Sequence, residues 1–207
     1  MKRGRGQSAG LTGDMVLGAA MELVDRDGLA ALTMRRLGSE LGVEAMTIYH
    51  HVPNKDALLD GLVERLVVDA SAPLSEEGTW QEALRGFAHA WLAALRAHPN
   101  VLPLVLTRPA VTTTNLDLME SVLHRLERAG FGLGRGLDVI YAVTGFVVGQ
   151  AALSPVEADA QVDELAAAGL EGHPLLAEAA RDSATQQVDR FDYALDAMLA
   201  GFQSVVD

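Results

Sequence analysis

The sequence predicts an all-α protein, and three observations point to that fold class. Hydrophobic residues make up 49% of the 207-residue chain, but aromatic residues only 5%, and Ala and Leu are abundant. Apolar residues recur at steps of three and four over several long stretches, which is the period of an amphipathic helix. No stretch sustains the apolar and polar alternation of a half-buried strand. We therefore expect helices packed on helices throughout.

The first helix is expected over residues 13–27. Its apolar residues follow the helical period, and Gly28 stands where a helix commonly ends. Leu29 and Leu32 continue the apolar pattern into a small core. The inward stripe of this helix consists of Val16, Ala20, Leu23 and Val24.

Residues 33–51 predict two short helices joined by a glycine turn. Leu37 and Leu41 share one face of a helix that Thr33 can cap at its N-terminus. Gly42 follows, where the left-handed conformation of a helix C-terminus favours glycine. Gly38 removes side-chain bulk where two helices must cross closely. This is the layout of a helix-turn-helix DNA reader, although the same arrangement also occurs in ordinary helical proteins.

The second of these helices is expected to begin around Ala45 and to be the recognition helix. Ile48 is its main inward-facing residue, which leaves polar residues on or beside the outer face. Hydroxyl, imidazole and basic side chains of this kind contact bases and phosphates in DNA complexes. The candidate DNA-binding residues are Thr33, Arg35, Thr47, Tyr49, His50, His51 and Lys55.

The next helix begins after Pro53, where Asn54 can cap it, and it buries Leu58, Leu59, Leu62 and Leu66. It links two predicted domains. Residues 1–56 form the helix-turn-helix DNA-binding domain, with a mobile basic arm over residues 1–12, and residues 57–207 form an effector-binding and dimerisation domain.

The segment LTMRRLGSELGVEAMTIYHHVPNKDALLDGLVERL, residues 32–66, closely resembles the DNA-binding region of the tetracycline-repressor (TetR) family. The resemblance covers roughly residues 13–67 without gaps. The segments LVLTRPAV and GFGLGRGLDVIYAVTGF look similar to the C-terminal domain of the tetracycline repressors themselves. The resemblance implies a homodimeric, ligand-responsive transcription factor, most often a repressor, that binds a pseudo-palindromic operator in double-stranded DNA.

The resemblance also implies roles for single residues. Arg35, Thr47, Tyr49 and His51 match groove-contacting positions of the family, and Lys55 matches a phosphate contact. The metal-coordinating histidine and glutamate of the tetracycline repressors, however, fall on Leu104 and Leu153 in our alignment. Tetracycline with magnesium is therefore not the expected inducer, and no metal or cofactor is expected. A small, mostly apolar effector is expected instead, with no known effector as the alternative.

The net charge of −12 is unusual for a DNA-binding protein, because neutralising phosphates requires Lys and Arg. Residues 1–56 carry seven basic and seven acidic groups, whereas residues 57–207 carry nine basic and twenty-one acidic groups. DNA repels the acidic part, so only the N-terminal end is expected to face it. The arm, with Lys2, Arg3 and Arg5, either reaches phosphates or the minor groove or is an uninformative start of the chain.

Further helices are expected over residues 79–97, 101–106 and 115–129. His89 and His98, together with Trp80 and Trp91, either line a pocket or belong to a packed core, and both readings stay open. The glycine-rich run 129–136 lacks the preceding strand and the lysine of a nucleotide-binding loop, so it predicts a helix cap and turn. The candidate effector-pocket residues are Phe87, Trp91, Leu102, Leu106, Leu116, Met119 and Phe146.

Two helices, over residues 137–153 and 181–206, have apolar faces with no evident partner within the chain. Gly145 and Gly149 provide a smooth strip for close helix approach, so these two helices predict a homodimer through a four-helix interface. The segment 154–171 between them is acidic and is expected to be loose. The candidate interface residues are Val143, Gly145, Gly149, Phe191, Leu195, Met198 and Phe202.

Other function classes receive little support. The chain has no cysteine, which excludes disulfides, thiolate zinc sites and cysteine nucleophiles. The histidines lack His-x3-His spacing, and no Gly-x-Ser-x-Gly or HExxH motif occurs, so no enzyme activity is expected. Asp14 and Glu22 bracket an uncharged run far shorter than the ~18 residues that span a bilayer, which predicts a cytoplasmic protein with no membrane segment. An all-helical enzyme or a protein-interaction adaptor remains the alternative, and a DNA footprint would exclude both.

Overall fold

A computed structural model describes residues 10–75, 77–108, 111–153, 170, 172–185 and 189–206. Within these ranges the chain is helical and contains no strand, which confirms the predicted all-α class. Residues 1–9 of the predicted arm lie outside the described residues, as does the predicted loose segment 154–171 except for Leu170. The elements are α1 (Gly13–Asp27), η1 (Leu29–Ala31), α2 (Met34–Leu41), α3 (Ala45–Ile48), α4 (Lys55–Ala70), η2 (Ala72–Ser75), α5 (Trp80–Ala97), η3 (Pro99–Val101), α6 (Leu102–Thr107), α7 (Thr113–Arg128), α8 (Leu133–Ala152), α10 (Pro174–Thr185) and α11 (Arg190–Gln203).

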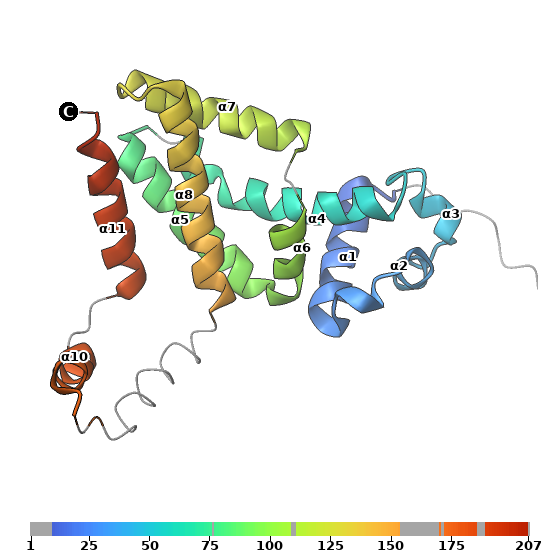
Figure 1. Cartoon of the computed structure of the whole chain (residues 1–207). Coiled ribbons are helices and arrows are strands. Elements are labelled where there is room, and N and C mark those ends of the chain that lie inside the picture. Colours follow the sequence, from blue (N-terminus) through green and yellow to red (C-terminus); the bar gives the residue numbers. More distant parts are fainter. Residues whose placement is uncertain are drawn as a thin grey trace, which may run out of the picture.

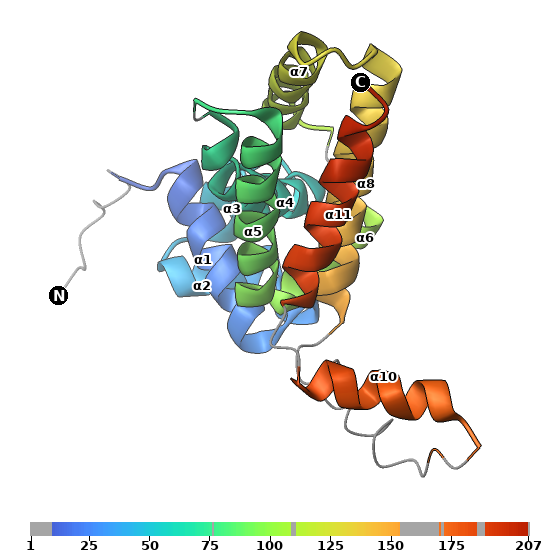
Figure 2. The same cartoon turned by 90° about the vertical axis from the view of Figure 1, so that its left-hand side faces the viewer.

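The helices form two groups that α4 connects (Figure 1). Helices α1, α2 and α3 form one end of the molecule, and α5, α7, α8 and α11 form the other. Figure 2 shows α11 beside α8, and the two helices contact each other. Helix α10 lies apart from the other helices in both views. The predicted domain boundary after residue 56 stays a prediction, because α4 runs through it without a break.

The caps and glycines predicted from the sequence determine where the helices of the helix-turn-helix begin and end. Thr33 Oγ1 accepts a hydrogen bond from the N–H of Arg36 at 3.1 Å, which caps α2. Gly42 ends α2 in the left-handed conformation, with φ of 68°. A Cβ atom on Gly38 would lie 2.8 Å from the carbonyl oxygen of Val43, so glycine permits the close crossing of α2 and the turn. Ile48 is fully buried and anchors α3.

Helix α4 begins at the predicted cap, where Asn54 Oδ1 accepts a hydrogen bond from the N–H of Ala57 at 2.8 Å. Its buried face contains Leu58, Leu62 and Leu66, and it packs against α1 on one side and α5 on the other. The helix has 16 residues, so it is about 24 Å long. One rigid element therefore touches both groups of helices.

Helix α5 lies at the centre of the second group and packs against α4 and α8. Thr79 and Glu82 form a capping box at its start. The backbone N–H and the hydroxyl of Thr79 both donate to the Glu82 carboxylate and lower its pKa below the ordinary value. The side chains buried along α5 are Trp80, Ala83, Leu84, Phe87, Ala88, Trp91, Leu92 and Leu95.

Two predicted helix boundaries are wrong. Helix α8 begins at Leu133 rather than residue 137, so only the first half of the glycine-rich run is a cap and turn, and its later glycines lie within the helix. The single helix predicted for residues 181–206 is two helices, α10 and α11. Asp189 accepts hydrogen bonds from the N–H groups of Phe191 and Asp192 and caps α11, so a new helix begins there.

The apolar stripe of α11 finds its partners within the chain, contrary to the prediction. Leu195 is 0% exposed, and Leu199 is also buried. Phe191 stacks on Phe146 of α8, with ring centroids 5.3 Å apart. This part of the predicted stripe is therefore covered within the monomer, because α11 closes the core against α8, whereas Met198 and Phe202 remain half-buried.

Candidate DNA-binding surface and ligand cavity

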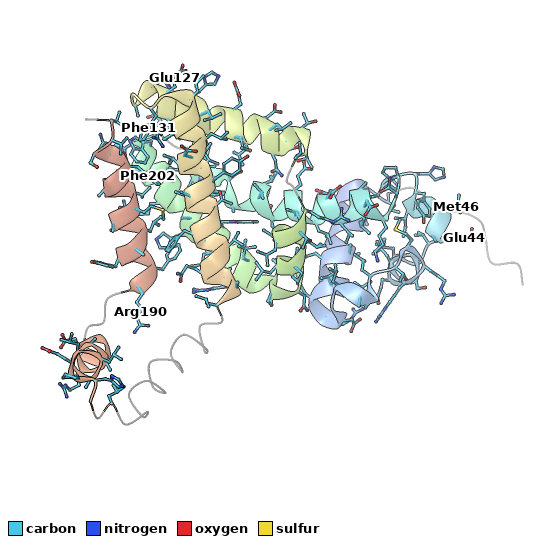
Figure 3. All side chains as sticks on the ribbon, viewed as in Figure 1. Glu44, Met46, Glu127, Phe131, Arg190 and Phe202 are labelled. Carbon is cyan, nitrogen blue, oxygen red and sulfur yellow. The ribbon has the colours of Figure 1, made fainter. Side chains whose placement is uncertain are left out.

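Helix α3 lies at the end of the molecule that is farthest from α11 (Figure 3, where Glu44 and Met46 mark it). Tyr49, His50 and His51 are exposed there, and Thr47 is half-buried. Met46 is 66% exposed but was missed by the sequence reasoning, which sought polar groups only. The available signal in the sequence was spacing, because Met46 lies two residues before the inward-facing Ile48 and therefore on a different face of the helix. The surface of α3 thus combines hydrogen-bonding groups with one apolar side chain that can contact a thymine methyl group.

The arginines near this surface differ in their partners. Arg26 pairs with Asp27 and Glu40, and Arg36 pairs with Asp27. These pairs raise the pKa of Arg26 through hydrogen bonds to Asp27 and Glu40. Among the described residues, no carboxylate pairs with Arg35. The Arg35 guanidinium is exposed in the first turn of α2 and is therefore available to DNA.

Lys55 is the first residue of α4 and is exposed beside α3. Two carboxylates, Asp56 and Asp60, stand in the following turn and would repel phosphate groups. Arg108 pairs with both and offsets one of their two negative charges, with Nη2 2.6 Å from Asp56 Oδ1 and Nη1 2.6 Å from Asp60 Oδ1. Hydrogen bonds to the two carboxylates raise the pKa of Arg108 above its ordinary value. The start of α4 thus presents a lysine next to two carboxylates whose combined charge Arg108 halves.

Arg108 also ties α6 to α4, because it directly follows α6 and pairs with two residues of α4. Its side chain is only 23% exposed, and one nitrogen donates as well to the carbonyl oxygen of Asp56. We call the contact among Arg108, Asp56 and Asp60 the α6–α4 clamp. A displacement of the C-terminal end of α6 must either move the first turn of α4 or break this clamp.

A second contact joins the two groups at the end of α1. The Asn100 amide donates to the carbonyl oxygens of Val24 and Asp25 at 3.0 and 3.1 Å, which satisfies acceptors that the helix end leaves open. His98 Nδ1 lies 2.7 Å from Asp25 Oδ2. The orientation of α1 is therefore tied to the end of α5.

A cavity of about 470 Å³ lies among α4, α5, α7 and α8. This volume lies within the ~300–1,000 Å³ of typical small-molecule sites. Val111, Leu116 and Tyr141 line the cavity and are also exposed, so they form its mouth. The lining consists of Val67, Leu74, Leu84, Phe87, Trp91, Val111, Asn115, Leu116, Leu118, Met119, Val122, Ile140, Tyr141, Val143 and Thr144.

The structure divides the predicted pocket residues. Phe87, Trp91, Leu116 and Met119 line the cavity. Three others do not, because α6 turns away from the cavity and α11 occupies one face of α8. Leu106 is exposed, Leu102 packs on the core, and Phe146 stacks on Phe191.

The other lining residues were missed, and two of them had been given a different role. Val143 was assigned to a dimer interface, although it is buried on the cavity wall. Asn115 was predicted only as the start of a helix, yet it is 3% exposed and is the single buried polar residue in the part of the chain that the structure describes. The signal was its spacing, because Asn115 lies four residues before Met119 on the same face of α7.

The predicted interface residues fall into two sets. Gly145 and Gly149 are exposed on the outer face of α8, and a Cβ atom at either would meet no atom within 4 Å. Met198 and Phe202 of α11 are half-buried. Val143, Phe191 and Leu195 are buried within the monomer.

Within the described ranges, no group of three His, Cys, Asp or Glu side chains is placed to hold a metal ion. Leu104 is buried, and Leu153 follows the end of α8. None of the described helices is both long and apolar enough to cross a membrane.

The chain matches two family models. The model for bacterial regulatory proteins of the tetR family covers residues 16–62, and the model for the tetracyclin repressor-like C-terminal domain covers residues 72–206. These ranges contain the helix-turn-helix and the cavity described above.

Similar whole proteins are DNA-binding repressors. Tetracycline repressor protein class D from Escherichia coli is 34% identical over 200 residues, covering 94% of this chain and 90% of that protein. The HTH-type transcriptional repressor DrrR1 from Streptomyces coeruleorubidus is 30% identical over 220 residues, covering 98% and 81%. The crystal structure of the TetR family protein ActR from Streptomyces coelicolor in complex with actinorhodin has a TM-score of 0.78 at 25% identity, covering 96% and 98%. The chain therefore belongs to the TetR family of ligand-responsive, DNA-binding transcriptional regulators.

Proposed function

We propose that this protein is a homodimeric repressor that binds a pseudo-palindromic operator and is released by a mostly apolar small molecule. The observation that carries the proposal is the position of α4. Lys55 at its start stands beside the recognition helix, and Val67 near its end lines the cavity. A ligand in the cavity therefore contacts the same helix that positions the DNA-binding surface.

Arg35 and Lys55 are the two basic residues proposed to contact the operator. Arg35 is exposed and has no carboxylate partner among the described residues, so its guanidinium can form a bidentate contact with a guanine edge. Lys55 at the start of α4 contacts a phosphate. Thr33, Thr47, Tyr49, His50 and His51 complete the proposed DNA-binding surface.

The outer faces of α8 and α11 form the proposed dimer interface. Gly145 and Gly149 let a second helix approach α8 closely, and Tyr193 of α11 is also exposed. Replacing Gly149 with Arg should produce monomers of unchanged helical content. Replacing Leu195 is not a valid test, because a polar residue at this buried position would unfold the monomer itself. If the Gly149→Arg variant still sediments with the wild-type mass, the interface lies elsewhere.

The ligand can release DNA only if it binds more tightly to a conformation in which the two DNA-binding surfaces are wrongly spaced. The cavity and the α6–α4 clamp give two routes for such a preference. A ligand can move α4 directly at Val67, or it can move α6 and displace Arg108. Either route changes the tilt of α4 and hence the distance between the two recognition helices of the dimer.

The experiment that tests the function is selection of bound duplexes from a random DNA pool by the purified protein, followed by sequencing. We expect an inverted repeat whose half-sites lie about one helical turn apart, roughly 34–36 Å. Footprinting on the recovered sequence then maps the protected bases. Enrichment of no sequence would contradict the proposal, and a single unrepeated half-site would contradict its dimeric form.

A further inference from the structure

The recognition helix α3 lacks the side chains that read a base through two hydrogen bonds. Those side chains are Arg, Lys, Asn and Gln. In a helix-turn-helix protein, the N-terminal residues of the recognition helix lie closest to the base edges. The four residues of α3 are Ala45, Met46, Thr47 and Ile48. A paired hydrogen bond to a base therefore cannot come from α3 itself.

Met46 is the most exposed large hydrophobic residue of the helix-turn-helix, with 66% of its surface accessible. The other methionine of this motif, Met34, is only 9% exposed and belongs to the core. Single exposed apolar residues are common on protein surfaces, so exposure alone assigns no role. The position of Met46 is informative, because it is the second residue of the recognition helix. An apolar side chain thus stands where a base-reading residue is expected.

The neighbours of Met46 extend its apolar surface. Tyr49 lies four residues after Ala45 and three after Met46, and residues at these spacings share one face of a helix. The backbone of Tyr49 keeps the right-handed helical conformation, so the face continues through it. Tyr49 is exposed, and Ala45 is half-buried. This face of α3 therefore offers apolar groups of the kind that contact the C5-methyl group of thymine.

Glu44 indicates which part of the DNA this face meets. It is exposed directly before α3, and its side chain does not cap the helix. Glu44 and Met46 lie together at the end of the molecule (Figure 3). Phosphate groups repel a carboxylate, and they offer no apolar contact to a thioether. The basic side chain suited to phosphate, Lys55, lies on α4 instead. The start of α3 is therefore better suited to base edges than to the DNA backbone.

We propose that Met46 determines specificity by recognising the C5-methyl group of a thymine in each operator half-site, with Ala45 and Tyr49 extending the apolar contact. None of the other three bases carries this methyl group in the major groove. Recognition therefore removes two apolar surfaces from water and forms no hydrogen bond. The proposal rests on the function proposed above, since it names the base that the recognition helix selects.

Replacing thymine with uracil tests the contact, because it removes the methyl group and keeps every hydrogen-bonding atom of the base. Each thymine of the operator recovered by selection is replaced singly with deoxyuridine, and binding of the full-length protein is measured by fluorescence anisotropy. We expect at least one thymine in each half-site at which affinity falls roughly threefold to fivefold, the factor for burying one methyl-sized group. No such position, or a recovered half-site without thymine, would overturn the proposal.

Variants assign this loss to the side chain of Met46. Met46→Gln keeps the length of the side chain but makes its end polar, so the thymine and uracil operators should bind with nearly equal affinity. Met46→Leu stays apolar and should retain a preference for thymine. Met15→Gln is the matched control, because Met15 is also an exposed methionine but lies on α1, and it should retain the full preference. A preference that survives Met46→Gln unchanged would contradict the role of Met46.

The same methyl group can also be presented on cytosine. A C·G pair replaces the T·A pair at the sensitive position, either unmodified or with 5-methylcytosine. The wild-type protein should bind the methylated operator more tightly than the unmodified one, and Met46→Gln should bind both equally. Equal binding by the wild-type protein would mean that the methyl group is not what α3 reads.

These measurements remain decisive if one variant fails. Met46 is exposed, so its substitutions should preserve the helical circular dichroism. If Met46→Gln no longer binds the operator, Met46→Ala replaces it and is judged by the same comparison of thymine with uracil. Failure to recover any inverted repeat contradicts the repressor function itself. An inverted repeat whose binding is insensitive to its thymine methyl groups overturns only the role of Met46.

Discussion

The DNA-binding end and the cavity end of the molecule are both helical, but they bury their side chains in different ways. Around α1 to α3, Leu23, Leu32, Leu37 and Ile48 are almost completely inaccessible, and most polar side chains stand at the surface, although Asp25 Oδ1 is buried without a partner. At the other end, a cavity of about 470 Å³ lies among α4, α5, α7 and α8. That end also leaves three polar atoms, on Trp91 and Asn115, buried without partners.

This difference indicates what each region has to do. A DNA-binding surface must hold side chains at fixed positions against the groove, and close packing without voids provides that rigidity. A ligand-responsive region must instead have a second state that the ligand can favour, and incomplete packing lowers the cost of reaching it.

The largest expected effect tests the packing difference directly. Leu37→Ala in α2 should lower the free energy of unfolding by about 2–5 kcal/mol, because Leu37 is fully buried and its removal leaves a void. Leu116→Ala at the cavity mouth should cost less than about 1 kcal/mol, since half of that side chain is exposed and the space beside it is already empty. Denaturant unfolding measures both values. Similar losses in the two variants would contradict the contrast.

The sequence predicted the DNA-binding end almost completely, because local signals determine it. The caps at Thr33 and Asn54 and the left-handed Gly42 involve residues within a few positions of each other. Gly38 permits a crossing only five residues away, at Val43. Such contacts can be read from spacing alone.

The cavity was predicted only in part, because its walls come from segments far apart in the chain. Periodicity places Phe87 and Asn115 on inward faces, but it does not say whether the space they face is filled. The error for Leu106 arose because its helix turns it outward. The error for Leu195 arose because α11, which begins at the Asp189 cap, closes against α8. Neither the orientation of Leu106 nor the packing of α11 on α8 can be read from neighbouring residues in the sequence.

The second prediction concerns side chains that protrude from the rigid end. Arg35→Ala should weaken operator binding by about 1–3 kcal/mol and relax specificity at one base position in each half-site. Its effect on folding should be small, because Arg35 is exposed and has no ion-pair partner among the described residues. Selection from a randomised operator pool measures the specificity. Arg36→Ala is the matched control, since that neighbour pairs with Asp27, and uniform weakening over all operators in Arg35→Ala would contradict base reading.

The third prediction separates phosphate contact from base reading. Lys55→Ala should weaken binding by a similar factor on every operator, by an amount smaller than the loss for Arg35→Ala. The slope of log affinity against log salt concentration should fall by about one for each phosphate contact that is lost. Fluorescence anisotropy over a series of salt concentrations measures it. An unchanged slope would exclude Lys55 as a phosphate contact.

The smallest expected effect concerns the α6–α4 clamp, which joins the two regions. A double-mutant cycle of Arg108→Met and Asp60→Asn should give an interaction energy of roughly 0.5–1 kcal/mol, since the pair is well aligned but partly exposed to solvent. The matched cycle, Arg85→Met with Asp196→Asn, breaks a more exposed pair between α5 and α11 and should give less.

Amide hydrogen exchange then shows which helix the clamp stabilises. If Arg108 holds the start of α4 to α6, Arg108→Met should lower protection at the N–H groups in the first turns of α4 and leave those in the middle of α1 unchanged. Arg85→Met should leave α4 protected, because its partner lies on α11. Helix α4 also lines the cavity at Val67. If only the N-terminal end of α4 loses protection, the clamp holds that end in place, and its loss would couple a movement of α6 to the DNA-binding surface. Equal loss of protection in α1 and α4 would instead mean that Arg108 stabilises the whole fold and has no part in the coupling.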